Sequence, residues 1–194
     1  SSYRSNPLGL AEFTLSRKDP AYVGRAKEVQ KAQKAIQEGK CPVEALPEMK
    51  PVMDVIKKDY PNVSKENLGV GSTIFAVKPG DGSAREQAAS CQKVLGGWAN
   101  IANEYATKRY RSNCVNWGIL PFTCPEKEIV LEPGEYLYLP GIRKAVEDGA
   151  TRFTAKVIGK DGAVRDLELE LNGVTEAEKK VLLAGSLINS YKEA

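Results

Sequence analysis

The sequence contains no histidine among its 194 residues. Histidine is the commonest general base near neutral pH and the commonest metal ligand, so this chain must use other side chains for either role. No segment approaches the roughly 18 consecutive apolar residues of a membrane-spanning helix, and the opening residues show no signal-peptide pattern. We therefore expect a cytoplasmic protein that has no membrane partner.

Cysteine is scarce and scattered. The four cysteines are Cys41, Cys91, Cys114 and Cys124, and no two of them form a C-x-x-C pair. Without a secretory signal they are expected to be reduced thiols rather than a disulfide framework. An iron–sulfur cluster needs several thiolates close together, so the spacing predicts no metal site in this chain. Cys91 falls on the apolar face of a predicted helix and is expected in the core.

An excess of charge is also missing. The 28 basic and 25 acidic residues leave a net charge of +3, which is too small to indicate nucleic acid as a partner. The run "KRYR" at 108–111 is typical of a solvated helix face. With 42% hydrophobic and 27% charged residues, the chain has the composition of an ordinary globular protein with a sizeable core.

What is present indicates an α/β fold, with a mixed central sheet flanked by helices. The first part of the chain predicts a helix from Asp19–Pro20 to Gly39, short helices around Pro47 and Pro51, a strand over 70–77, a helix over 85–95, a strand over 98–103 and a helix over 104–118. We take 1–68 as an irregular and helical N-terminal segment and 69–194 as the core of the domain.

The second part predicts a late β-hairpin and a closing helix. A short strand is expected over 127–133, a short helix or turn over 141–149, and a hairpin over 151–171 that turns at Asp161–Gly162 and buries Phe153, Ala155 and Val157. Thr175 and Glu178 have the spacing of a capping box. The closing helix is expected to bury one stripe, formed by Val181, Ala184, Ile188 and Tyr191.

The stretch "GDGSAREQAA", residues 80–89, joins a predicted strand to a predicted helix. Such a turn leaves backbone N–H groups pointing the same way at a helix N-terminus, which favours an anion. Gly80 and Gly82 would let a ligand approach the backbone, and Arg85 offers a planar fork of donors for a carboxylate or phosphate. Ser83 and Glu86 also have the S-x-x-E spacing of a capping box, so Ser83 acting only as a helix cap stays open. The G-x-G-x-x-G and GK[ST] nucleotide motifs are absent.

This turn, together with "LGGWANIANEYATKRYRSNCVNWGILPF" and the late "AGSLIN", resembles the C-terminal, swivelling β/β/α domain of the aconitase superfamily. The family pattern is a G-x-G-S-S-R-E-H turn, then a strand, a helix containing asparagine and a "GLLP" segment. Here these become 80–87, "GWANIA", "SNCVNWG" and "GILP". The match is dense over 69–122 and returns at 184–189.

The resemblance implies a hydro-lyase that moves water across a carbon–carbon bond of a di- or tricarboxylate substrate. It places Ser83 as the base that removes the proton α to a carboxylate, with Arg85, Ala84 and Gly82 in the substrate-binding turn. Arg4, in "YRSN", stands where the family has another substrate-binding arginine. A [4Fe-4S] cluster is expected in the partner domains and not in this chain, which alone is expected to be inactive.

Two departures from the family pattern bear on the substrate and on activity itself. Ala84 replaces the second serine of the turn, and Gln87 replaces its histidine. Three interpretations stay open: a swivel domain cut from a larger iron–sulfur hydratase, which the Ser1 start favours; a free-standing small subunit of the isopropylmalate-isomerase type; and a non-catalytic module that binds carboxylate or phosphate anions.

Overall fold

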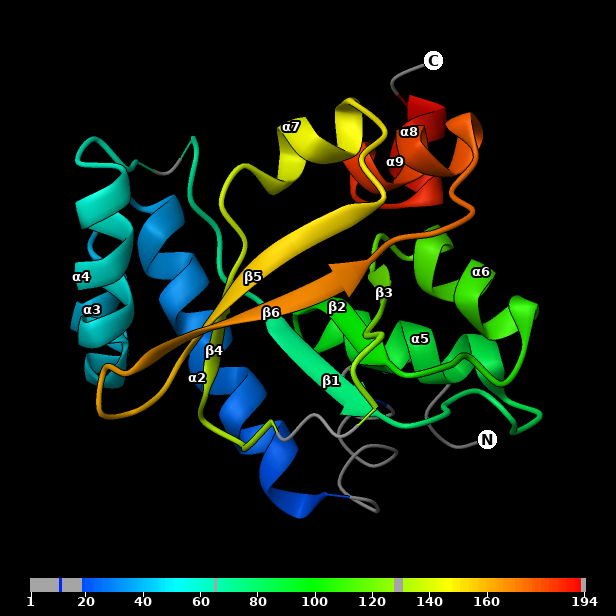
Figure 1. Cartoon of the computed structure of the whole chain (residues 1–194), viewed down its shortest axis with the longest axis horizontal. Coiled ribbons are helices and arrows are strands. Elements are labelled where there is room, and N and C mark those ends of the chain that lie inside the picture. Colours follow the sequence, from blue (N-terminus) through cyan, green and yellow to red (C-terminus); the bar gives the residue numbers. More distant parts are fainter. Residues whose placement is uncertain (1–10, 12–18, 65, 128–130, 193–194) are drawn as a thin grey trace.

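The computed structural model of the chain describes residues 11, 19–64, 66–127 and 131–192. In this part of the chain, six strands form one mixed sheet in the order β1-β2-β3-β6-β5-β4 (Figure 1). The strands are β1 (Ser72–Ala76), β2 (Gly97–Ala102), β3 (Leu120–Thr123), β4 (Tyr136–Tyr138), β5 (Arg152–Ile158) and β6 (Val164–Glu170). The mixed α/β class predicted from the sequence is confirmed.

Helices surround this sheet. They are α2 (Pro20–Gln37), α3 (Pro42–Ala45), the 3-10 helix η1 (Pro47–Met49), α4 (Lys50–Asp59), α5 (Arg85–Val94), α6 (Lys108–Asn116), α7 (Ile142–Glu147), α8 (Glu176–Ala184) and α9 (Leu187–Lys192). In Figure 1, α2, α3 and α4 lie to one side of the hairpin and α5 and α6 lie beside the parallel strands. The predicted helix from Asp19 is confirmed, since the Asp19 side chain accepts a hydrogen bond from the Ala21 N–H and Pro20 occupies the first turn.

The sheet has a parallel half and an antiparallel half. Strands β1, β2 and β3 are parallel to one another, whereas β6, β5 and β4 are antiparallel. Among the described residues the two halves share a single register pair, Thr123 of β3 with Glu170 of β6. The rings of Phe122 and Phe153 meet edge to face across this junction, with centroids 5.5 Å apart. The main core therefore continues from one half to the other although the ladder between them is narrow.

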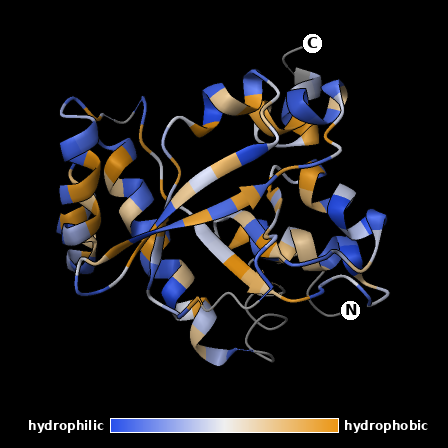
Figure 2. Cartoon of the chain, viewed as in Figure 1, coloured by the Kyte–Doolittle hydropathy of each residue, from blue (hydrophilic) through white to orange (hydrophobic). Residues whose placement is uncertain are grey.

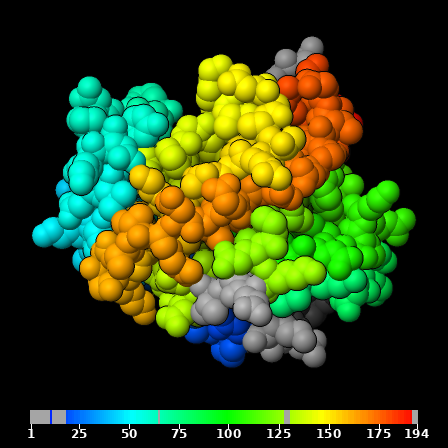
Figure 3. All heavy atoms as spheres, in the orientation of Figure 1, coloured from blue at the N-terminus to red at the C-terminus, as the bar shows by residue number. Residues whose placement is uncertain are grey.

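The hairpin shows why these residues form strands. Phe153, Ala155 and Val157 are buried, as predicted, and the residues between them, Thr154 and Lys156, are exposed or partly exposed. Ile158, at the end of β5, is buried as well, in a different cluster. Figure 3 shows the hairpin lying across the viewed face of the molecule, and Figure 2 shows its mixture of polar and apolar residues. Gly162, at a φ of +82°, supplies the left-handed residue that the predicted turn needs.

Some expectations about the elements and their exposure were wrong or incomplete. The helix expected over 104–118 is α6, which begins at Lys108 because Thr107 caps it. Strand β3 was not predicted. A strand was expected over 127–133, but the described residues of that range are not in a strand, and residues 128–130 lie outside the described part. The next strand, β4, begins later, at Tyr136. The run at 108–111 was expected to be a solvated helix face, but only half of it is. Lys108 and Arg109 are exposed, whereas Tyr110 is buried and Arg111 is partly buried.

The closing helix was predicted as one continuous element, and the structure breaks it into α8 and α9. Gly185 ends α8 with a φ of +87°, a conformation that L residues rarely adopt. The predicted apolar stripe is broken there, so that Ile188 and Tyr191 are 63% and 74% exposed. Gly118, just before β3, sits against the Gly185 backbone and leaves no room for a Cβ atom. The "GILP" and "AGSLIN" segments, far apart in sequence, therefore meet in space.

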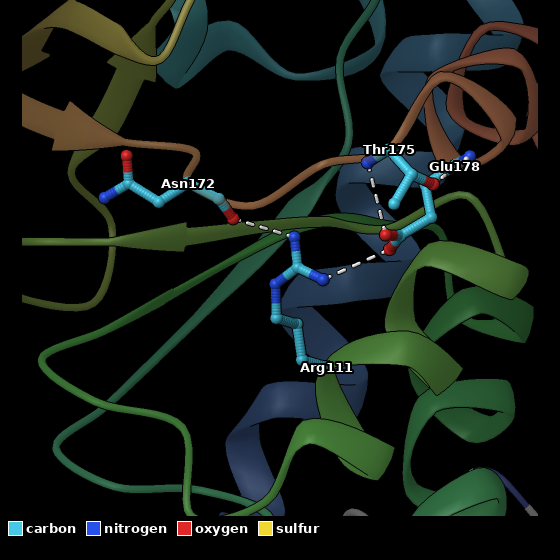
Figure 4. Close-up of polar contacts among 4 residues, drawn as sticks. All are labelled: Arg111, Asn172, Thr175 and Glu178. Carbon is cyan, nitrogen blue, oxygen red and sulfur yellow. Dashed lines mark hydrogen bonds and ion pairs between the residues drawn. The ribbon is translucent and has the colours of Figure 1, made fainter.

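A polar clasp ties α6 to the start of α8 (Figure 4). The Arg111 guanidinium donates to Glu178 Oε2 at 3.1 Å and to the Asn172 carbonyl at 2.9 Å. Glu178 also completes the predicted capping box, in which its N–H donates to Thr175 Oγ1 and its carboxylate accepts from the Thr175 N–H. The Arg111 and Glu178 side chains are only 20% and 23% exposed, so one carboxylate serves both the cap and the contact between helices.

We expect Glu178→Ala to lower the free energy of unfolding by about 1–2 kcal/mol, because it removes half of a capping box and a partly buried ion pair. Glu176→Ala is the matched control: it also removes an acidic residue from the first turn of α8, but the Glu176 side chain is 82% exposed. Glu178→Gln should retain the cap and lose only the ion pair. Urea unfolding measures all three, and equal losses for Glu178→Ala and Glu176→Ala would contradict the clasp.

Candidate functional site

The Gly80–Arg85 turn lies at the edge of the sheet where the parallel strands end. It follows β1, and the segment 103–107 follows β2 at the same edge. The start of the segment after β3 lies there too, because Asn103 Nδ2 donates to the carbonyls of Cys124 and Glu126 at 3.3 and 3.0 Å. The carboxyl ends of parallel strands are the usual place for a ligand site in α/β proteins.

The segment 103–107 holds the approach to the turn. The N–H groups of Glu104 and Ala106 donate to the carbonyls of Val77 and Pro79 at 3.1 and 2.9 Å. Thr107 Oγ1 donates to the Gly80 carbonyl at 3.1 Å. These hydrogen bonds hold the chain in place as far as Gly80. The residues that the family pattern places in the substrate-binding turn, Gly82 to Arg85, follow directly.

Ser83 is not a helix cap. The N-cap of α5 is Ala84, no side chain caps this helix, and the predicted box of Ser83 with Glu86 does not form. Ser83 is exposed, and its hydroxyl makes no hydrogen bond to any described residue. An α-helix leaves its first N–H groups without intrahelical partners, so the start of α5 presents free donors beside a free hydroxyl. The interpretation of Ser83 as merely a cap is therefore wrong.

Arg85 occupies the first turn of α5 and is half-buried. Its Nε atom has no exposed surface and no hydrogen-bond partner in the described part of the chain. No described carboxylate forms an ion pair with its guanidinium either. A cation in the first turn opposes the helix dipole, and Glu86 is the acidic residue that the same turn supplies.

The two glycines of the turn differ. Gly80 has a φ of +98° and lies against Tyr110, so both its conformation and its surroundings require glycine. Gly82 has an ordinary φ, and a Cβ placed on it would meet nothing within 4 Å. The fold of this chain does not explain glycine at position 82, which leaves open space above the turn.

A buried polar cluster beneath the turn was not predicted from the sequence. Asn100, only 2% exposed, accepts from Gln92 Nε2 at 2.6 Å and donates to the Tyr110 hydroxyl at 3.2 Å and to Cys114 Sγ at 3.4 Å. Burial raises the pKa of the Cys114 thiol to about 11, which keeps it protonated near neutral pH. The asparagine within the apolar strand "WANIAN" was the signal that could have revealed this cluster.

The cysteines of this chain do not fit an iron–sulfur cluster. Cys91, Cys114 and Cys124 are buried in three separate apolar clusters, and Cys41 lies near the start of α3. Cys91 lies in the core, as predicted. In the described part of the chain no three histidine, cysteine, aspartate or glutamate side chains come together as a metal site.

The described part of the chain does not enclose the turn. Two hollows of about 220 and 390 Å³ lie elsewhere, one between α2 and Trp98 and the other between the end of α2 and α4, and neither is lined by residues of the turn. Trp98 lies over Gly69 and Gly71 but remains 39% exposed. Arg4, the other predicted substrate-binding residue, lies outside the described residues. No described helix is both long enough and apolar enough to cross a membrane.

Comparisons with known proteins agree with these features. The family model of the aconitase C-terminal domain matches residues 29–127, just over half of the chain. The chain therefore belongs to the aconitase C-terminal domain family, and the resemblance seen in the sequence is confirmed.

Two curated relatives and one solved structure are similar to the chain. The 3-isopropylmalate dehydratase small subunit of Metallosphaera sedula is 33% identical over 125 residues, which are 63% of this chain and 71% of that protein. The homoaconitase small subunit of Thermus thermophilus is 35% identical over 96 residues, 50% of this chain and 58% of that protein. A crystal structure of 3-isopropylmalate dehydratase from Methanocaldococcus jannaschii matches 77% of this chain and 83% of its own, with 22% identity and a TM-score of 0.42.

Proposed function

We propose that this chain is the small subunit of a hydro-lyase that acts on a di- or tricarboxylate, and that the Gly80–Arg85 turn is its half of the active site. The observation that carries the proposal is the turn itself: in a member of the aconitase C-terminal domain family, Ser83 and Arg85 stand without partners among the described residues at the carboxyl edge of parallel strands. That the two curated relatives are named as small subunits supports a separate chain over a fused domain.

Ser83 is the proposed general base. A serine hydroxyl is a weak base unless its charged form is stabilised. Ser83 comes just before the N-terminus of α5, whose free N–H donors, together with Arg85 in the first turn, would supply that stabilisation. The Ser83 oxygen, in its deprotonated form, would take the proton from the carbon α to a substrate carboxylate. The resulting negative charge on the substrate spreads into that carboxylate, which Arg85 would hold with two parallel hydrogen bonds.

The iron–sulfur cluster of the proposed enzyme would be bound by a partner subunit. Family membership implies a [4Fe-4S] cluster, and the separated cysteines described above give this chain no ligand set for one. We place the cluster in a large subunit, where it would supply Lewis-acid chemistry. The partner would also enclose the turn, most of whose residues are exposed in the described part of the chain.

Two departures affect which substrate fits. Ala84 is exposed at the N-cap position and offers a methyl group where the family pattern has a hydroxyl. Gln87 is exposed in the first turn of α5 and cannot carry a charge where the pattern has histidine. Ala84 removes one hydroxyl, and Gln87 removes a side chain that could carry a positive charge, which together favour a dicarboxylate over a more highly charged tricarboxylate.

We expect the purified chain alone to be colourless and inactive, and to gain hydratase activity only with the cluster-bearing large subunit from the same organism. The measurement is the change in ultraviolet absorbance as the unsaturated acid forms by dehydration or is consumed by hydration. 3-Isopropylmalate and homoaconitate, for which the relatives are named, would be the first substrates.

Three results would count against the proposal. A visible cluster spectrum in the chain alone after treatment with iron and sulfide would contradict the assignment of the cluster to a partner. Hydration by the chain alone would contradict a half-site. Tight binding of citrate or phosphate by the chain alone, with no activity in the complex, would favour the non-catalytic anion-binding module.

A further inference from the structure

Tyr110 lies directly beneath the first residue of the Gly80–Arg85 turn. A Cβ built on Gly80 would meet the Cβ, Cγ and Cδ1 atoms of Tyr110 at 2.5 to 2.6 Å, so the glycine backbone rests on this side chain without a gap. Thr107 reinforces the contact: its Oγ1 accepts from the Tyr110 N–H at 3.1 Å and donates to the Gly80 carbonyl at 3.1 Å. The first turn of α6 therefore holds Gly80 both by packing and by hydrogen bonding.

The Tyr110 ring is itself fixed from below. The residue is 6% exposed, and Asn100 Nδ2 donates to its hydroxyl at 3.2 Å. Burial raises the pKa of the Tyr110 phenol, so the hydroxyl stays protonated. A ring held at its polar end and packed along its side cannot move without breaking the buried hydrogen bond.

The same cluster also reaches the far end of the turn. Asn100 accepts a 2.6 Å hydrogen bond from Gln92, a residue of α5, the helix that begins at Arg85. Ala89 of α5 packs with Tyr110 and Cys114 in one buried cluster. The contacts therefore connect both ends of the turn. Gly80 packs on Tyr110, Tyr110 is hydrogen-bonded to Asn100, and Asn100 is hydrogen-bonded to α5, the helix that begins at Arg85.

We infer that Tyr110 is a positioning residue for the proposed base and the proposed carboxylate-binding arginine. Ser83 has no hydrogen bond of its own within the described chain and no cap to hold it. Its place is set by the two flanks of the turn, Gly80 and α5, and Tyr110 contacts both. The inference on position concerns the turn alone, and its catalytic consequence rests on the proposed function.

The first test measures the turn without requiring activity. In Tyr110→Leu, the amide protons of Ala106 and Ala88, which donate to the carbonyls of Pro79 and Ala84 at 2.9 and 3.0 Å, should exchange with solvent at least about tenfold faster than in the wild type. NMR of the chain measures both amides. The matched control is Tyr138→Leu, because Tyr138 is 9% exposed, lies in β4 and packs in a different cluster. Urea unfolding corrects for any loss of global stability.

The second test measures catalysis in the complex with the large subunit. Misplacing a reactive group by about 1 Å can cost roughly 10²-fold, so Tyr110→Leu should lower kcat by about 10- to 100-fold. Tyr110→Phe keeps the ring beneath Gly80 and should restore most of this loss. Tyr138→Leu should retain kcat even where its stability falls.

The outcomes separate the two claims. Equal exchange at Ala88 and Ala106 in Tyr110→Leu and Tyr138→Leu would overturn the positioning role. Faster exchange only in Tyr110→Leu would support it even if the wild-type complex hydrated no carboxylate, a result that would overturn the proposed function alone. Faster exchange with unchanged kcat in an active complex would overturn the catalytic consequence.

Discussion

Ser83→Ala in the complex with the large subunit should lower kcat by about 10²- to 10⁴-fold, the usual loss when a general base is removed. The substrate should still bind, because Arg85 and the N–H groups at the start of α5 are unchanged. The free energy of unfolding should stay within about 0.5 kcal/mol of the wild type, as for other exposed positions without partners. The structure sharpens this expectation, since Ser83 makes no capping hydrogen bond whose loss could unfold the helix.

Two further variants make this result decisive. Ser83→Gly should behave like Ser83→Ala, since neither has a hydroxyl. Ser90→Ala, in the helix α5 that follows the turn, removes a hydroxyl that donates only to the Gln87 carbonyl at 3.2 Å, and it should retain full turnover. Steady-state kinetics and the melting temperature are measured for each. Full turnover in a stably folded Ser83→Gly complex would show that Ser83 is only a structural part of the Gly80–Arg85 turn and not the base.

Arg85→Lys should lower kcat/KM by about 10²-fold, because lysine keeps the charge but cannot form two parallel charge-assisted hydrogen bonds, each of which contributes about 1.5–3 kcal/mol. Stability should not fall with activity. The Arg85 Nε atom is buried without a partner in the described chain, so lysine removes an unsatisfied donor. A drop in kcat/KM with an unchanged or higher melting temperature is therefore the expected signature.

The control for this variant is Arg109→Lys, a change of the same kind at an exposed position in the first turn of α6. It should leave kcat/KM unchanged. If Arg85→Lys retained near-normal kcat/KM in the complex, the proposed contact with a substrate carboxylate would be wrong. If both variants lost activity equally, the loss would not be specific to the fork of Arg85, and the proposed contact would be unsupported.

The elements with strong local signals could be predicted from the sequence. The hairpin with its Asp161–Gly162 turn, the Thr175 capping box and the helix that begins at Arg85 all follow from spacing within a few residues. Strand β3 could not be predicted in this way, because its proline and its four-residue length give no strand pattern. Its place comes from pairing with β2, a contact between residues distant in sequence.

The candidate site shows the same division. The sequence motif singled out Ser83 and Arg85, but the S-x-x-E spacing wrongly predicted a cap. The actual N-cap, Ala84, has no side-chain acceptor, so the local rule did not apply. Tyr110 was missed because its role depends on packing against Gly80, thirty positions earlier in the chain, which no local pattern records.

The narrow junction between β3 and β6 has a consequence for how this molecule can change over generations. The family match, residues 29–127, ends just after β3, so the hairpin half, including the single register pair at Glu170, lies beyond it. The Asp161–Gly162 turn closes the hairpin at the end away from the Thr123–Glu170 pair, so inserted residues in this turn should change the length of the hairpin without moving Gly80, Thr107 or Tyr110.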